Sequence, residues 1–202
     1  EPWKFPQSHT IPEINTQFKT ELADNEEKFQ PYQRDEKLAR PWVIPGTKGF
    51  EHRIGGLEKQ NITGNISYDA ENHQTMVKIR QEKVDSIANH IPLQKIDSGA
   101  NKGKVLVIGW GSTYGAIKSA CLELQNQGHE VSHVHLRYVR PFPKNLGEII
   151  GNFDKVLIPE INNGQLIKII RDAYLVDAKG YNKIMGIPIT KAELITTIKE
   201  ML

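Results

Sequence analysis

The 202-residue sequence predicts an α/β protein with a three-layer, mostly parallel sheet, preceded by an irregular connector that contains one amphipathic helix. Two observations support this class. In the second half, short apolar runs alternate with helix-like segments, which is typical of parallel sheets covered on both faces. The run 105–108 also passes through a small-residue turn into a helix-compatible segment, as a buried parallel strand does before its crossover helix.

The first half of the chain has a different composition. Six of the eleven prolines lie within the first 45 residues, where no hydrophobic period is sustained. Further along, Val77, Val84, Ile87 and Ile91 lie near one face of a helix and predict an amphipathic helix near 71–91. We therefore divide the chain into a connector, residues 1–103, and an α/β domain, residues 104–202.

Runs of Val, Ile and Leu bounded by Gly, Pro or Asn predict the strands of this domain. The expected strands are Val105–Trp110, Val131–Val139, Val156–Glu160 and a short one within 182–186. Capping residues predict where helices begin. These signals are Ser112 before a helix at 113–127, Asn145 with Glu148, and Thr190 with Glu193. Another helix is expected after Asn162-Asn163-Gly164, because apolar residues then recur at helical spacing.

Composition excludes several classes of protein. The 26 basic and 24 acidic residues are interspersed, so no nucleic-acid-binding or membrane-binding surface is indicated. No apolar stretch approaches the ~20 residues that a membrane helix needs. The single cysteine, Cys121, cannot form an internal disulfide or supply the roughly four ligands of an iron–sulfur cluster. We expect it to be a small core residue.

The turn at Gly109–Gly115 invites comparison with a dinucleotide site, but its spacing differs. The fingerprint needs a third glycine where Tyr114 stands, and the glycine comes one residue later. The next strand ends in Arg137 to Arg140, where a nicotinamide dinucleotide site would need a carboxylate. A tight turn that packs a helix on the sheet is therefore the favoured interpretation.

No catalytic constellation or metal motif is evident, so we assign no catalytic and no metal-binding residue. His133 and His135 alternate along one strand and share a face of the sheet, which fits a packed pair better than a metal site because no third ligand follows. Glu160 lies at a strand end beside Asn162 and Asn163. Either it accepts hydrogen bonds from loop amides, the favoured interpretation, or it is catalytic.

Taken together, the motifs resemble the C-terminal part of the α subunit of 2-oxoacid:ferredoxin oxidoreductases. In the α/β domain they are Gly109–Gly115, His135-Leu136-Arg137, Pro141-Phe142-Pro143, Glu160–Leu166, Asn182-Lys183 and Gly186-Ile187-Pro188. In the connector they are Arg40-Pro41, Ile44–Thr47, Glu51–Glu58, Thr63-Gly64-Asn65 and the stretch from Asn72 to Lys83. The variant His52–Glu58 most resembles bacterial 2-oxoglutarate enzymes.

The resemblance implies a domain similar to the transketolase C-terminal domain. It also implies a cytoplasmic enzyme that oxidatively decarboxylates a 2-oxoacid to its acyl-coenzyme A and passes the electrons to ferredoxin. The cofactors of such an enzyme are thiamine diphosphate, Mg²⁺ and an iron–sulfur cluster, with the diphosphate and Mg²⁺ held by the β subunit. Since the chain begins at Glu1 without a methionine, we expect it to be a fragment. Because it has a single cysteine and no acidic motif for a Mg²⁺-diphosphate site, we expect it to be inactive alone and to bind no cofactor itself.

Arg53 is the one residue that we assign to the substrate. It lies before two glycines in the segment most suggestive of a 2-oxoglutarate enzyme, and a dicarboxylate suits a planar, permanently charged donor. A surface ion pair with Glu51 or Glu58 is the competing interpretation. His52 is a weaker candidate. A different class of function also remains open, namely a non-catalytic interaction or regulatory domain that kept the same scaffold.

Overall fold

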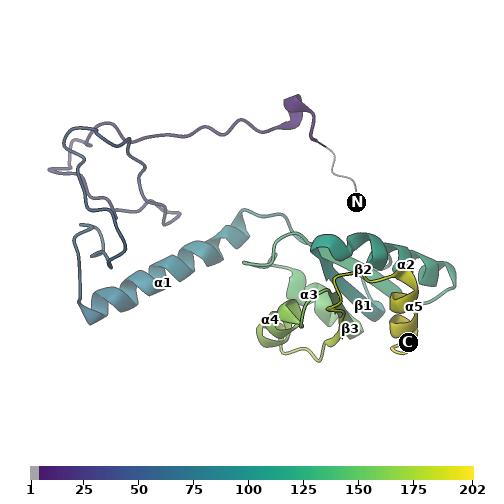
Figure 1. Ribbon diagram of the computed structural model, residues 1–202. Coiled ribbons are helices and arrows are strands. Elements are labelled where there is room, and N and C mark those ends of the chain that lie inside the picture. The colour runs from purple at the N-terminus through teal and green to yellow at the C-terminus, as the bar shows by residue number, and fades with distance from the viewer. Residues whose placement is uncertain (1–4) are drawn as a thin grey trace. The chain divides into compact units, whose positions relative to one another are not determined.

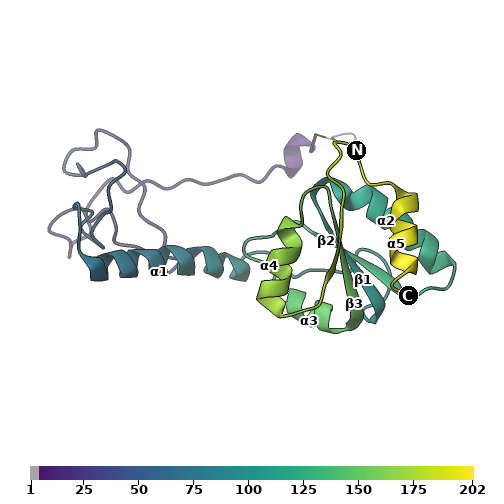
Figure 2. The ribbon, with the colours of Figure 1, turned by 60° about the horizontal axis from the view of Figure 1, so that its bottom comes forward.

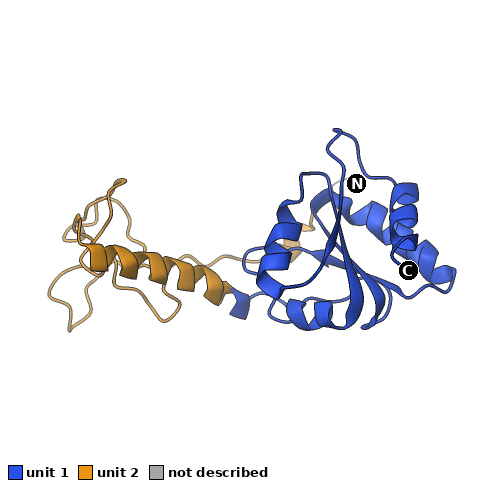
Figure 3. Ribbon diagram, turned by 90° about the horizontal axis from the view of Figure 1, so that it is seen from below, with its two compact units in different colours: residues 1, 88–202 blue, residues 2–87 orange. Residues whose placement is uncertain are grey.

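The computed structural model describes residues 5–202, so the first four residues of the expected connector lie outside the described residues. The chain divides into two compact units (Figure 3). The N-terminal unit extends to Ile87, and the α/β unit runs from Ala88 to Leu202. Within the described residues, no helix is long and apolar enough to cross a membrane.

The α/β unit is built on one sheet of four parallel strands. They are β1 (Gly103–Trp110), β2 (Val131–Leu136), β3 (Phe153–Glu160) and β4 (Lys179–Asn182), in the order β2-β1-β3-β4. The side chains of Val105 to Ile108 are fully buried, because β1 lies inside the sheet with helices over both of its faces. The predicted α/β class with a mostly parallel, three-layer sheet is confirmed.

Helices cover both faces of the sheet (Figures 1 and 2). On one face lie α2 (Tyr114–Asn126) and α5 (Lys191–Lys199), and on the other lie α3 (Leu146–Gly151) and α4 (Gln165–Tyr174). Alternate strand residues supply the two cores, since Val105 and Val107 pack toward α2 and α5 while Leu106 and Ile108 pack toward α3 and α4.

The order of the strands places one special position at the carboxyl edge of the sheet. From β1 the chain passes through α2 to β2, and from β2 it crosses β1 to reach β3 on the other side. The two connections therefore leave on opposite faces, which makes the gap between the carboxyl ends of β1 and β3 a topological switch point. Open α/β sheets usually bind ligands there.

Several element boundaries differ from the prediction. The second strand ends at Leu136 instead of Val139, and the last strand is β4, upstream of the expected 182–186. Pairing sets the position of β4, because Leu157 lies opposite Lys179 and Glu160 opposite Asn182. After Asn182 the chain turns into a loop in which Gly186 has a φ of 69°.

The predicted caps were right at α5, right in position at α3 and wrong at α2. Thr190 and Glu193 form the expected capping box of α5. Ser112 lies within a short 3₁₀ turn, Gly111–Thr113, so α2 begins after Thr113. Asn145 holds the N-cap position of α3, as predicted, but its side chain makes no capping hydrogen bond because its amide is bound elsewhere. It accepts from the Gln94 backbone N–H at 2.8 Å and donates to the Gln94 carbonyl at 2.9 Å, which ties residue 94 to the α/β unit.

The N-terminal unit contains α1 (Ala70–Ser86), whose first turn is capped by Asp69 through the Asn72 backbone N–H at 2.7 Å. The expected apolar stripe on this helix was wrong. Val77 and Ile87 are exposed, and the buried residue is Met76. Its sulfur lies 3.5 Å from a guanidinium nitrogen of Arg34, so the inward face of α1 is set by the preceding loop.

Candidate functional site

Glu160, at the end of β3, is fully buried. Its carboxylate accepts hydrogen bonds from the backbone N–H groups of Leu166 at 2.9 Å and Ile167 at 3.1 Å. It also accepts from the indole N–H of Trp110 at 3.3 Å. The side-chain oxygen of Asn162 likewise accepts a hydrogen bond from the Gln165 backbone N–H at 2.9 Å. Two side chains thus satisfy the first turn of α4, where N–H groups have no helical partner.

These contacts support the favoured interpretation of Glu160. A buried carboxylate is stable only when hydrogen bonds replace its lost water, and here three N–H donors do so. The favoured interpretation, a carboxylate that satisfies loop amides, is what the structure has. Glu160 therefore holds α4 and Trp110 at the carboxyl edge of the sheet.

The turn from β1 into α2 is built for close packing. A Cβ on Gly109 would lie 2.5 Å from the side chain of Ile117. Thr113 closes the turn, because its hydroxyl donates to the Trp110 carbonyl at 2.9 Å and accepts from the Trp110 N–H at 3.2 Å. Both features fit the favoured interpretation of a tight turn that packs a helix on the sheet.

His133 and His135 share the face of β2 that α2 covers, and their ring centroids are 5.9 Å apart. Tyr114 of α2 packs on both, with its ring centroid 5.5 Å from that of His133 and 4.9 Å from that of His135. His133 is fully buried, and burial lowers its pKa to about 4. Among the described residues no group of three His, Cys, Asp or Glu could hold a metal ion. The pair is thus part of a packed aromatic cluster.

A hollow of about 480 Å³ opens at the carboxyl edge of the sheet. Its walls come from the start of α2 and from the loop after β4. Lys183 lines it but is already committed, with its ammonium 2.8 Å from the Glu193 carboxylate and 3.0 Å from the Pro188 carbonyl. Hydrogen bonds from Lys183 and from Thr190 lower the pKa of Glu193 to about 2.

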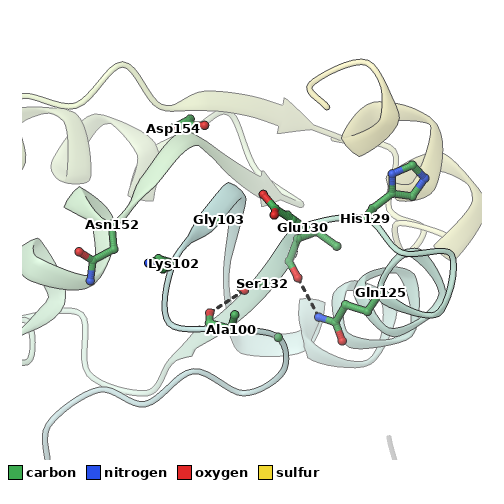
Figure 4. Close-up of a pocket in the computed structure, with 11 residues that line it drawn as sticks. Ala100, Lys102, Gly103, Gln125, His129, Glu130, Ser132, Asn152 and Asp154 are labelled. Atoms are coloured by element: carbon green, nitrogen blue, oxygen red, sulfur yellow. Dashed lines mark hydrogen bonds between the residues drawn. The ribbon is translucent and has the colours of Figure 1, made fainter.

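A second hollow, of about 590 Å³, lies at the amino edge of the sheet (Figure 4). Several of its polar side chains fasten neighbouring segments. Ser132 donates to the Ala100 carbonyl at 2.8 Å, and Gln125 donates to the Val131 carbonyl at 2.9 Å. A Cβ on Gly99 would lie 2.4 Å from the Ser132 hydroxyl, so the strand and the incoming chain touch here. These contacts give the amino edge a structural role.

A third hollow, of about 450 Å³, lies within the N-terminal unit beside the predicted substrate residue. His52 lines it, and its Nδ1 lies 2.8 Å from the Phe50 carbonyl, while its ring meets Phe29 edge-on at 5.3 Å. Arg53, the next residue, is exposed and has no ion pair within residues 5–202. Glu58 binds His73 and Arg80 instead.

Sequence reasoning did not single out Arg40, which also lines this hollow. Its guanidinium carbon lies 3.9 Å from the centroid of the Tyr32 ring, and its Nε donates to the Pro31 carbonyl at 2.8 Å. Arg40-Pro41 was visible as a motif of the connector. The contact with Tyr32 was not, because no helical or strand period relates residues 32 and 40.

The side chains of this chain do not fit an iron–sulfur cluster. Cys121 is fully buried in the core under α2, and burial raises the pKa of its thiol to about 12. A cluster ligand must be a thiolate, and a neutral thiol in the core cannot act as one.

Comparison with known proteins gives a consistent result. Residues 103–192 match the family model of the pyruvate:ferredoxin oxidoreductase core domain II. The chain is 46% identical over 195 residues to the 2-oxoglutarate oxidoreductase subunit KorA of Mycobacterium tuberculosis, covering 96% of this chain and 29% of that protein. It is 32% identical over 155 residues to a 2-oxoacid:ferredoxin oxidoreductase subunit alpha of Saccharolobus solfataricus, covering 73% of this chain and 24% of that subunit.

A solved structure also matches. It is the 2-oxoglutarate:ferredoxin oxidoreductase of Magnetococcus marinus with 2-oxoglutarate, coenzyme A and succinyl-CoA bound, at 26% identity and a TM-score of 0.85. The match covers 97% of this chain and 34% of that one. The chain thus spans about a third or less of the relatives it matches. It belongs to the α-subunit family of the 2-oxoacid:ferredoxin oxidoreductases and contains their core domain II.

Proposed function

We propose that this chain is part of the α subunit of a thiamine-diphosphate-dependent 2-oxoacid:ferredoxin oxidoreductase of the 2-oxoglutarate type. The complete enzyme oxidatively decarboxylates the 2-oxoacid to its acyl-coenzyme A and reduces ferredoxin, in the cytoplasm. The observation that carries this proposal is the 46% identity to a 2-oxoglutarate oxidoreductase subunit, sustained over 195 residues and therefore over both units.

Within that enzyme, the chain has a structural, subunit-interface and substrate-side role. Thiamine diphosphate, Mg²⁺ and the iron–sulfur cluster belong to other parts of the enzyme, with the diphosphate and Mg²⁺ on the β subunit. Two findings in this chain support the division. Cys121 is a neutral core residue, and residues 5–202 bring no three metal-ligating side chains together.

Co-purification with a β subunit tests this proposal. We expect the full-length α subunit to pull down a β subunit, and the pair to reduce ferredoxin only when a 2-oxoacid and coenzyme A are present. The 202-residue chain alone should neither turn over 2-oxoglutarate nor bind thiamine diphosphate tightly in calorimetry. An α subunit that purifies alone and supports no 2-oxoacid oxidation would instead indicate a non-catalytic interaction or regulatory domain on this scaffold.

Arg53 is our candidate for binding a substrate carboxylate. Its guanidinium has no acidic partner within the described part of the chain, and the competing ion pair with Glu58 is absent because that carboxylate binds His73 and Arg80. Gly55, two residues later, has a φ of 132°, a backbone conformation that residues other than glycine rarely adopt. The loop therefore presents an uncommitted planar cation, which suits bidentate binding of a carboxylate.

Kinetics of the complete enzyme test this role. Arg53→Met should lower kcat/KM for 2-oxoglutarate by roughly 10- to 150-fold, the effect of losing one charged hydrogen bond. Arg53→Lys should restore only part of it, because an ammonium keeps the charge without the fork. Lys48→Met, which removes an exposed charge from the same unit, is the matched control. Unchanged kinetics in Arg53→Met would leave Arg53 as a surface residue.

A further inference from the structure

The hollow of the N-terminal unit has the composition of a small-molecule site. Most of its wall is apolar, from Pro41, Val43, Ile44, Pro45, Phe50 and Ile54. A few polar side chains join this wall, and a volume of about 450 Å³ falls within the range of ligand pockets. The arrangement favours a ligand with an aliphatic body and one or two polar ends.

Arg40 supplies a fixed cation at this wall. The face of Tyr32 and the Pro31 carbonyl hold its guanidinium, at 3.9 Å and 2.8 Å respectively. Only the Nε–H is used by that hydrogen bond, so the N–H groups on its two terminal nitrogens remain for a ligand. Arg40 also has no ion pair within residues 5–202.

The surroundings of Arg40 strengthen its positive field. On the same tyrosine ring lies Arg34, with its guanidinium carbon 5.3 Å from the centroid. Arg34 donates to neutral partners, the Asn61 side chain at 2.7 Å and the Tyr32 carbonyl at 3.1 Å. Burial first, and then the charge of Arg40, lower the pKa of Arg34. Two guanidinium groups therefore share one ring with no carboxylate bound to either.

His52 faces the ligand space with one nitrogen free for use. Because the Phe50 carbonyl can only accept a hydrogen bond, the His52 Nδ1 at 2.8 Å must carry the proton. The other nitrogen, Nε2, makes no hydrogen bond within the described chain. The edge-on contact with Phe29 at 5.3 Å fixes the ring. Nε2 is therefore placed to accept a hydrogen bond from a hydroxyl or other donor group of a ligand.

We propose that this hollow binds a small aliphatic carboxylate, with its anionic group on Arg40 and its polar end toward His52. The assignment goes beyond the proposed role of Arg53 and does not require that the chain take part in 2-oxoacid oxidation. One acidic residue, Glu51, also lines the hollow. Its charge opposes the ligand, so the proposal makes opposite predictions for Arg40 and Glu51.

4-Hydroxybutyrate is a suitable probe, because its aliphatic body joins one carboxylate to a hydroxyl group that can donate to Nε2. It is titrated into the isotope-labelled 202-residue chain, and the signals of Arg40 Nε, the His52 ring and the Phe50 amide are followed by NMR. We expect saturable shifts with roughly millimolar affinity. Arg40→Met should weaken binding about tenfold or more. Glu51→Gln should tighten it by about 1.5- to 5-fold. 4-Hydroxybutyramide, which is uncharged, should not bind.

Lys37→Met removes a positive charge elsewhere in the same unit and should leave the affinity unchanged. The proposal is overturned if 4-hydroxybutyrate causes no saturable shift, if 4-hydroxybutyramide binds equally, or if Arg40→Met binds like the wild type. The Phe29 and Phe50 ring signals report whether a variant keeps its fold. If Arg40→Met loses these signals, the other two variants test the proposal instead. Arg40→Lys should then bind the probe more weakly than the wild type, and Glu51→Gln should bind it more tightly. Turnover is not used, so failure here leaves the proposed enzyme function standing.

Discussion

In the α/β unit the buried carboxylate of Glu160 has three N–H partners, whereas in the N-terminal unit Arg40 and Arg53 have no acidic partner within residues 5–202. Lys183 of the α/β unit is likewise bound to a carboxylate and a carbonyl. Polar groups in one unit thus stabilise its own fold. In the other, two cations are still available to a ligand.

Apolar side chains divide in the same way. The strand β1 of the α/β unit has four consecutive fully buried residues, and a core cluster lies on each face of its sheet. In the described part of the N-terminal unit the buried apolar side chains are Phe29, Phe50 and Met76, and the ring centroids of Phe29 and Phe50 are 4.8 Å apart. Burial of apolar surface is the main stabilising contribution to a fold, so the α/β unit is the stable scaffold. The N-terminal unit is suited to binding.

Amide hydrogen exchange should show the largest difference between the units. We expect fast exchange for much of residues 5–65 and slow exchange for Val105–Ile108 and Val156–Ile158. The amides of the central strands exchange only when the whole unit unfolds, which should slow their exchange about 10³-fold or more. Mass spectrometry or NMR on the 202-residue chain measures both. Uniform protection would show that the N-terminal unit is as stable as the sheet.

A pair of leucine substitutions should separate the units by stability. Leu124 of α2 is fully buried, and Leu124→Ala should lower the free energy of unfolding of the α/β unit by about 2–5 kcal/mol. Leu57 of the N-terminal unit is 53% exposed, and Leu57→Ala should change the free energy of unfolding of the N-terminal unit by less than about 0.5 kcal/mol. Urea denaturation followed by NMR signals from each unit makes the comparison. Similar costs would contradict the difference in packing.

The sequence predicted the α/β unit better than the N-terminal unit, for a physical reason. Strands and helices repeat with fixed periods, so β1, β3 and the capping box at Thr190 could be inferred from spacing. The hollow depends on contacts that no period encodes, such as Arg40 on Tyr32. For the same reason the burial of Met76 could not be predicted, because it depends on contact with a loop that includes Arg34. The same holds for the hydrogen bonds of Asn145, whose partner lies 51 residues away.

His133 should make the stability of the α/β unit depend on pH. Its pKa falls from 6.5 to about 4, chiefly by burial, so the unfolded chain binds more protons between these two values. Stability should therefore fall as the pH is lowered from 6.5 toward 4, by roughly 3 kcal/mol in all. The groups facing this ring are Asp97, which raises its pKa, His135 and Lys118, which lower it, and the Tyr114 ring.

Urea denaturation at several pH values measures this dependence. His133→Phe keeps a ring against Tyr114 and should flatten the curve between pH 6.5 and 4.5, the upper part of the histidine window. The carboxyl group of Glu193 has its pKa lowered from 4.5 to about 2, so its protonation lowers the stability only below that window. His90→Gln changes an exposed histidine of the same unit and should keep the dependence. If the stability of His133→Phe depends on pH as steeply as that of the wild type, another group causes the pH dependence.

Two helix caps give the smallest and most closely matched comparison. Thr190 caps α5 of the α/β unit through the Glu193 N–H at 3.3 Å, and Asp69 caps α1 of the N-terminal unit through the Asn72 N–H at 2.7 Å. Replacing either with Ala should cost about 1 kcal/mol. Thr190→Ala should lower the stability of the α/β unit in urea. Asp69→Ala should speed amide exchange in α1 about fivefold and leave that transition unchanged, because a cap stabilises only the unit that its helix packs into. A shift of the α/β transition in Asp69→Ala would show that the two units unfold together.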